Sequence, residues 1–135
     1  MANGSRSAHP NALPNYQNAI ILREKLEGYV LNPIHEATHP SVSSGKDKAR
    51  VFKSALGFDQ SNWELLEQRI RDELPYYEAV LMEEDQHGKR YNVILPITGL
   101  NGRTVDVLTG WIVKIGTVYP FLATTYVVSD SRGEL

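Results

Sequence analysis

The chain of 135 residues has no cysteine, four histidines and no long apolar run. Without cysteine there are no disulfides, thiolate metal ligands or thiol nucleophiles, which fits a reducing compartment, and we expect a cytoplasmic protein. No segment approaches the roughly 18 apolar residues of a membrane span, and the polar start of the chain lacks a signal-peptide core. We therefore expect no membrane association.

Several catalytic and cofactor-binding motifs are also missing. The sequence contains no Walker loop, no dinucleotide-binding glycine motif, no serine-nucleophile elbow and no His-Glu-x-x-His metal motif. An enzyme built from this chain is therefore predicted to work without a metal or a cofactor. The net charge of −2 gives little help to nonspecific nucleic-acid binding, so a nucleic-acid site must be a local basic patch.

The composition is that of a single folded domain with polar ends. With 41% hydrophobic and 22% charged residues, the chain is long enough to build one core without staples. Residues 1–17 are rich in Asn, Ser and Pro and are predicted to form a flexible N-terminal arm. Residues 129–135 are a polar tail. No repeat or linker interrupts residues 18–128, which we expect to form one domain.

The hydrophobic pattern predicts helices first and strands second. Helical spacing predicts a short helix near 23–31, a second helix between Ser44 and Gly57, and a third from a capping box at Ser61–Glu64 to Pro75. The period then becomes two, and turns near 86–89, 101–102 and 115–120 separate four strands. This order predicts an α+β fold, with about three N-terminal helices packed on one face of a four-stranded antiparallel meander sheet.

A histidine-containing loop and the basic helix after it carry the residues most suited to chemistry. His35 and His39 lie between Pro33 and Pro40, and imidazoles exchange protons near neutral pH. They lack a third ligand pattern, so a metal pair is disfavoured. The N-terminus of the following helix is suited to anions, and its basic residues are the predicted phosphate-binding groups: Lys46, Arg50 and Lys53.

Lys48 is the basic residue whose position needs most explanation. On a helical wheel it lies about 50° from the centre of the apolar stripe formed by Ala49, Phe52, Ala55 and Leu56. A lysine so close to a packed face must snorkel, pair with a carboxylate or line a cleft. Two interpretations follow: a snorkelling lysine beside the sheet, or a cleft cation that binds a phosphate or a carboxylate.

Several segments resemble a small domain family of unassigned function found in bacteria and phages. The resemblance covers residues 20–128, and it rests on the segments Tyr29–Pro33 with His35, Gly45, Lys48–Phe52, Leu56–Phe58, Asn62–Trp63, Gly88–Tyr91, Gly102–Arg103, Trp111–Ile112 and Thr124–Tyr126. Members occur as stand-alone proteins and as C-terminal modules of polymorphic toxins. The layout of helices followed by a meander is also similar to the superfamily of barnase, EndoU-type and colicin-type nucleases and RelE toxins.

That superfamily cleaves RNA without metal, with a His or Lys on its helical part and Arg, Ser, Thr or Tyr on its sheet. The resemblance thus implies these catalytic residues: His35, His39, Lys48, Arg90, Thr125 and Tyr126. This chain departs from the pattern by an insert, Glu36–Ser44, so that either histidine matches it. In this hypothesis a histidine is the general base, Lys48 and Arg90 stabilise the phosphorane, and Thr125 binds a non-bridging oxygen. The other histidine or Tyr126 protonates the leaving oxygen.

The first hypothesis is therefore a metal-independent, toxin-type endoribonuclease-like domain, with RNA as substrate and a cognate antitoxin or immunity protein as partner. The alternative is a non-catalytic interaction module, such as an immunity protein, an antitoxin or a phage-associated adaptor. The near-neutral charge favours this alternative, because ribonucleases usually carry positive charge to engage phosphates. A third hypothesis is a member of the family whose site is inactive. The sequence does not indicate an oligomeric state.

Overall fold

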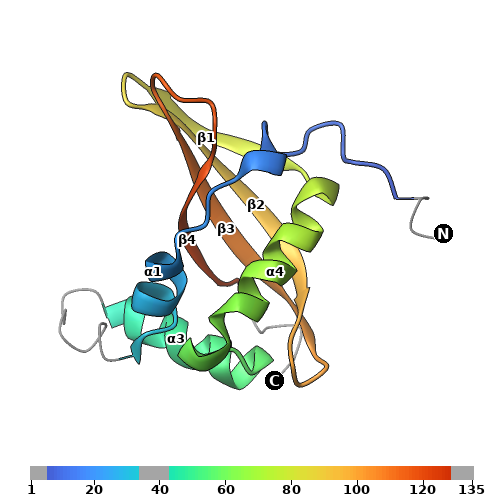
Figure 1. Ribbon diagram of the computed structural model, residues 1–135, viewed down its shortest axis with the longest axis vertical. Helices are drawn as coiled ribbons and strands as arrows, with labels where there is room; N and C mark the ends of the chain where they lie inside the picture. Colours follow the sequence, from blue (N-terminus) through green and yellow to red (C-terminus); the bar gives the residue numbers. More distant parts are fainter. Residues whose placement is uncertain (1–5, 34–42, 129–135) are drawn as a thin grey trace.

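Four strands form one antiparallel sheet in which neighbours in sequence are neighbours in space (Figure 1). The computed structural model describes residues 6–33 and 43–128, and in the second range it describes side chains from Lys48 onward. The strands are β1 (Ala79–Asp85), β2 (Gly88–Thr98), β3 (Thr104–Lys114) and β4 (Phe121–Val127), in the spatial order β1-β2-β3-β4. The four-stranded antiparallel meander predicted from the sequence is confirmed.

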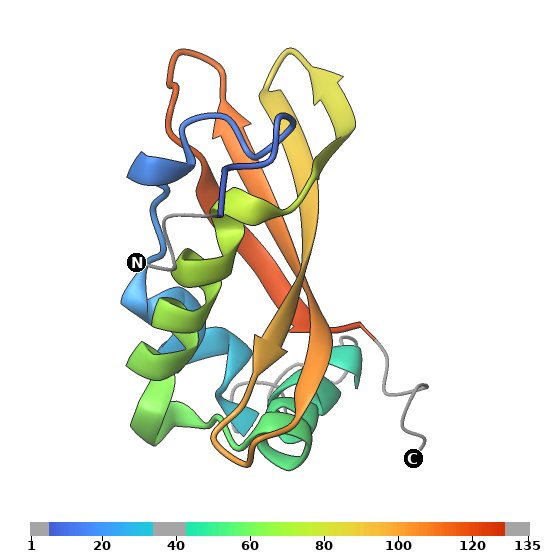
Figure 2. The ribbon, with the colours of Figure 1, turned by 90° about the vertical axis from the view of Figure 1, so that its right-hand side faces the viewer.

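The helical segments all precede the sheet in the chain, which confirms the α+β class. They are η2 (Tyr16–Asn18), α1 (Arg23–Lys25), the π-helical turn η3 (Leu26–Val30), α3 (Ser43–Leu56), η4 (Gln60–Asn62), α4 (Trp63–Glu73) and η5 (Leu74–Tyr76). Helix α4 contacts β2, whereas α3 lies across the end of the sheet near the β2–β3 turn (Figure 2). Helix α3 also contacts β3 and β4, and this brings its side chains close to the β4 edge.

The start and the inner stripe of α4 follow from local sequence. Leu66, Ile70 and Leu74 recur at helical spacing and are buried, as the periodicity predicts. The predicted capping box is shifted by two residues, because Asp59 rather than Ser61 caps the turn that leads into α4. Asp59 Oδ1 accepts a hydrogen bond from the Ser61 backbone N–H at 2.9 Å, and the Asp59 N–H donates to Asn62 Oδ1 at 2.8 Å. The hydrogen bond from the Ser61 N–H to this carboxylate is charge-assisted and therefore stronger than one to a neutral hydroxyl.

Two glycines allow α3 to end directly beneath the sheet. Gly57, predicted as the end of this helix, has φ 84°, the left-handed conformation that commonly terminates helices. Gly99, at the end of β2, packs so closely that a Cβ atom there would lie 2.2 Å from the carbonyl oxygen of Leu56. The next residue, Leu100, donates its backbone N–H to that same oxygen at 2.8 Å. The C-terminus of α3 is thereby joined to the β2–β3 turn.

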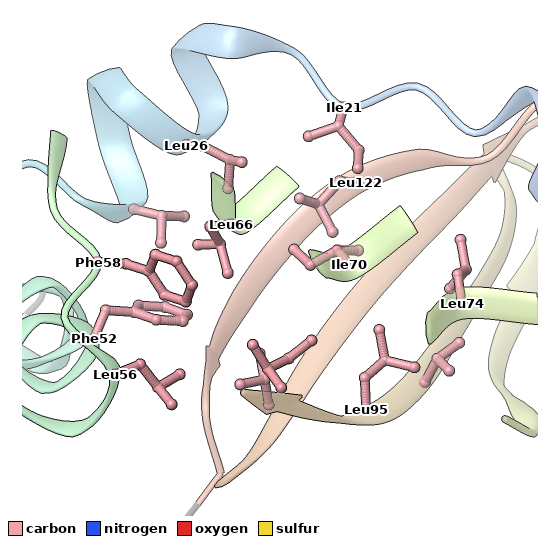
Figure 3. Packing of buried hydrophobic residues seen from close by; sticks show 14 of the residues in the cluster. Ile21, Leu26, Phe52, Leu56, Phe58, Leu66, Ile70, Leu74, Leu95 and Leu122 are labelled. Carbon is pink, nitrogen blue, oxygen red and sulfur yellow. The ribbon is translucent and has the colours of Figure 1, made fainter. Parts of the chain in front are cut away.

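The core lies between the helices and the inner face of the sheet (Figure 3). Alternate residues over most of β2 and β3 are buried there, as period-two alternation predicts: Val93, Leu95, Ile97, Val105, Val107, Thr109 and Trp111. Trp111 is 1% exposed and donates its indole N–H to Thr109 Oγ1 at 2.8 Å. The Thr109 hydroxyl donates in turn to the Val93 carbonyl oxygen at 2.8 Å. The buried indole N–H of Trp111 and the buried hydroxyl of Thr109 are therefore both hydrogen-bonded.

The N-terminal segment differs from the flexible arm predicted for residues 1–17. Leu13 is only 1% exposed and belongs to the core. The backbone N–H of His9 donates to the Pro75 carbonyl, and the Asn11 carbonyl accepts from the Ala79 N–H, both at 2.8 Å. One apolar anchor and these backbone bonds dock residues 6–17, although their composition is polar. Residues 1–5 and the predicted tail 129–135 lie outside the described residues.

Candidate functional site

The face of the sheet that points away from the core, here called the outer face, carries a row of four residues across all four strands. Val80 of β1 pairs with Asn92 of β2, Asn92 with Gly110 of β3, and Gly110 with Thr124 of β4. Their neighbours along the central strands, Val93 and Thr109, are buried on the inner face. Because successive side chains alternate between faces, the row projects outward.

Lys48 of α3 reaches the outer face at its β4 edge. Its Nζ atom donates a hydrogen bond to Thr124 Oγ1 at 3.2 Å and lies 5.6 Å from the ring centroid of Tyr126. Lys48 is half-buried and Tyr126 is 37% exposed. These three side chains are called the Lys48 cluster below. They place a cation, a hydroxyl and a phenol together, which suits binding of an anion.

The hydroxyl in this cluster belongs to Thr124, whereas the residue predicted from the sequence for this role is Thr125. Thr125 is fully buried on the inner face, and its hydroxyl donates to the Leu108 carbonyl oxygen at 2.8 Å. The reason is an irregularity in the β3–β4 pairing, where Gly110 pairs with Thr124 but Trp111 pairs with Leu122. The extra residue, Ala123, reverses the alternation along β4. Leu122 and Thr125 therefore both face the core, and Thr124 faces outward.

Arg90, the catalytic cation predicted on the sheet, lies apart from the Lys48 cluster. It precedes Asn92 by two residues on β2, so it shares the outer face, and its Nε atom is 3.8 Å from Glu83 Oε1. Two strand spacings of about 4.8 Å separate β2 from β4. Arg90 is exposed and thus borders the same face without touching Lys48 or Thr124.

The predicted phosphate-binding residues of α3 are on a different surface. Arg50 and Lys53 line a cavity of about 480 Å³ together with Leu31, Pro33, Ala49 and Asp59. Lys53 Nζ forms an ion pair with Asp59 Oδ2 at 2.7 Å. Hydrogen bonds from the Lys53 ammonium and the Ser61 hydroxyl lower the pKa of Asp59 to about 2. The charge of Lys53 is thus already balanced by a carboxylate.

Three predicted residues cannot be placed. His35 and His39 lie outside the described residues, and the side chain of Lys46 is outside the described part of α3.

Within residues 6–33 and 43–128, no three or more His, Asp or Glu side chains gather as metal ligands would. None of the helices in this part of the chain is long and apolar enough to cross a membrane.

A groove on the outer face lies beside the Lys48 cluster and was not predicted. It has a volume of about 420 Å³ and is lined by Tyr77, Glu78, Val80, Met82, Asn92, Ile94 and Leu108. Gly110 separates the groove from Thr124. A Cβ atom at Gly110 would lie 2.8 Å from Thr124 Cγ2 and 3.5 Å from Asn92 Oδ1. Asn92 and Thr124 therefore flank a single point on the sheet that carries no side chain.

The signal for this groove was present in the sequence only as an alternation pattern. Asn92 and Gly110 occupy outward positions between apolar inward ones, but the same pattern fits a solvated face. Only the strand register shows that the two are opposite each other. The sequence alone therefore gave no reason to choose them.

Together, the fold and this face define a small α+β domain that carries a cationic cluster and an apolar groove on the open side of an antiparallel sheet. The chain belongs to the family described as a domain of unknown function, DUF6883, whose family model matches residues 12–129. This confirms the predicted membership of a family of unassigned function. The match includes Leu13 and so extends into the docked N-terminal segment. No curated protein and no solved structure matches the chain.

Proposed function

We propose that this domain binds RNA on the outer face of its sheet and cleaves it by metal-independent transesterification at the Lys48 cluster. The observation that carries the proposal is the contact of Lys48 Nζ with Thr124 Oγ1 at 3.2 Å, beside the Tyr126 ring. It joins a helix cation to a sheet hydroxyl and an aromatic ring, and the resemblance to the RNA-cleaving superfamily implies a similar division of roles. A helical layer over the inner face would leave the outer face open to substrate.

The reaction needs no co-reactant. The ribose 2′-oxygen loses its proton to a base and attacks phosphorus, and the bond from phosphorus to the 5′-oxygen breaks. The 5′-oxygen takes up a proton, which leaves a 2′,3′-cyclic phosphate and a 5′-hydroxyl. Negative charge on the non-bridging oxygens increases in the transition state, and a fixed cation stabilises it.

Each member of the Lys48 cluster suits one part of this step. The Lys48 ammonium faces the phosphate charge. Thr124 Oγ1 accepts a hydrogen bond from Lys48, and within the described residues no group accepts the hydrogen of the Thr124 hydroxyl. This hydroxyl therefore donates its hydrogen to a non-bridging oxygen of the substrate. The Tyr126 phenol supplies the proton for the 5′-oxygen. The general base remains the one predicted from the sequence, His35 or His39.

Replacement of Lys48 tests the proposal. We expect Lys48→Ala to lower the cleavage rate of a single-stranded RNA oligonucleotide by about 10²-fold, the scale of losing one preorganised donor. Lys25→Ala is the matched control, because Lys25 also lies over a tyrosine ring, 5.3 Å from the centroid of Tyr29, but on the helical side of the fold. Products are assayed for cyclic phosphate ends, and circular dichroism checks that both variants fold. An unchanged rate in Lys48→Ala would remove the cluster from catalysis.

A protein-binding module is the second candidate, and the outer groove is the observation that favours it. Val80, Met82 and Ile94 are each about half exposed there, at 47%, 57% and 47%. Exposed apolar side chains that adjoin one another mark binding surfaces. Expression in a bacterial host separates the candidates: a ribonuclease arrests growth and Lys48→Ala relieves the arrest. Unhindered growth, together with no cleavage of total RNA, supports the binding module.

A further inference from the structure

We infer that the outer groove is a nucleobase subsite, which holds the base next to the phosphate bound at Lys48 and in which Asn92 reads the edge of that base. The inference rests on the proposed function and names its substrate as single-stranded RNA with a preferred base at the cleavage site. The catalytic step proposed above does not involve Asn92 or the groove, and the family description assigns no role to either.

The first support is that the groove and the Lys48 cluster are adjacent, with only Gly110 between them. Thr124, which accepts a hydrogen bond from Lys48, and Asn92, which lines the groove, lie against the same point above Gly110. Any side chain at position 110 would stand between them. Two strand spacings of about 4.8 Å each separate β2 from β4. This span is of the order of the distance from a phosphate to the far edge of its own base.

The second support is the chemistry of the groove. Its lining is mostly aliphatic or aromatic, with Ile94 and Leu108 on the central strands and Val80 and Met82 on β1. Flat heterocycles bind well on such surfaces. The carboxylate of Glu78 also borders the groove and would repel a second phosphate. A neutral base therefore fits the groove, while the phosphate fits at Lys48.

The third support is the state of the Asn92 side chain. Asn92 is half-buried, yet in the described part of the chain no group forms a hydrogen bond with its side-chain amide. An amide offers both a donor and an acceptor, and it can form two hydrogen bonds to one base edge. A protein partner would cover the groove equally well by its apolar area, but it gives no reason for an unpaired amide on the same row of the sheet as Thr124, which binds Lys48.

The experiment uses four deoxyoligonucleotides that each contain one ribonucleotide, A, C, G or U, so that each has a single cleavable linkage. We expect the wild-type domain to prefer one base by about tenfold or more in kcat/KM. In Asn92→Ala that preference should fall to within about threefold, because the favoured substrate slows and the others do not. Asn92→Asp keeps the shape, removes the donor and should change which base is preferred. Asn18→Ala, at an exposed position of η2, is the control.

The outcomes separate this inference from the proposed function. Cleavage with an unchanged base preference in Asn92→Ala, or cleavage without any preference in the wild type, overturns the subsite and leaves the ribonuclease intact. Without any cleavage the ribonuclease proposal fails. The subsite is then judged by titrating the four nucleoside 3′-monophosphates and following the Asn92 side-chain amide by NMR. A selective shift of that amide supports the subsite, and its absence overturns it.

Discussion

Thr124 and Thr125 are adjacent in the chain but project from opposite faces of the sheet. Thr124 accepts a hydrogen bond from Lys48 on the outer face, whereas Thr125 is buried and donates to the Leu108 carbonyl oxygen. The two side chains are chemically identical and differ in the face of the sheet on which they lie. Any difference between their variants therefore reports the face they occupy.

Valine at these two positions should separate activity from stability. We expect Thr124→Val to reduce RNA cleavage by roughly 10²-fold, because a donor to the phosphate is lost, with unfolding free energy changed by less than about 0.5 kcal/mol. Thr125→Val should keep most activity and lose about 1 kcal/mol, the scale of one buried hydrogen bond. Cleavage assays and urea unfolding measure both. If Thr125→Val lost activity without losing stability, the functional hydroxyl would belong to Thr125 rather than to Thr124, and this prediction would be wrong.

The ion pair between Lys53 and Asp59 should make stability depend on acid pH. The lowered pKa of Asp59, about 2 against an ordinary 3.8, means that the unfolded chain binds a proton there before the folded chain does. This contribution is fully present above about pH 4 and is lost as the pH falls toward 2. Asp59→Asn keeps a good cap residue and removes the charge. Near neutral pH we expect the variant to be less stable by at most about 1 kcal/mol, since the pair is partly exposed.

Urea unfolding at several pH values between 7 and 2 measures this effect. The difference between the wild type and Asp59→Asn should shrink as the pH falls through this window. Lys53→Gln is the companion variant, because it removes the other half of the pair. It should also reduce the change in unfolding free energy between pH 4 and 2. If Asp59→Asn showed the same loss of stability between pH 4 and 2 as the wild type, the dependence would belong to other carboxylates.

Docking of the N-terminal segment should contribute to the free energy of unfolding. Leu13 is 1% exposed in the core, and Leu13→Ala should cost about 2–5 kcal/mol, the range for truncation of a buried leucine. Leu22→Ala is the control, because Leu22 is 50% exposed and its truncation should change little. Thermal and urea unfolding measure both. Equal stabilities for the two variants would mean that residues 6–17 do not contribute to the core.

Local patterns were enough to predict much of the fold. The apolar stripe of Leu66, Ile70 and Leu74 predicted α4, and the left-handed Gly57 was predicted as the end of α3. Alternation predicted four strands, and short turns between them predicted the meander order. These features depend on residues within a few positions of each other, so they could be predicted without knowledge of distant contacts. The docked N-terminal segment was missed, since its contacts with Pro75 and Ala79 are distant in sequence.

For the site, the sequence by itself determined that Lys48 lies near the packed side of its helix, because helical geometry alone places it beside the apolar stripe. Only the tertiary structure decided what Lys48 meets. The additional residue in β4 turns Thr124 outward and Thr125 inward, and the strand register sets Asn92 opposite Gly110. A bulge and a register are properties of paired strands, so they depend on two segments at once and cannot be read from either one alone.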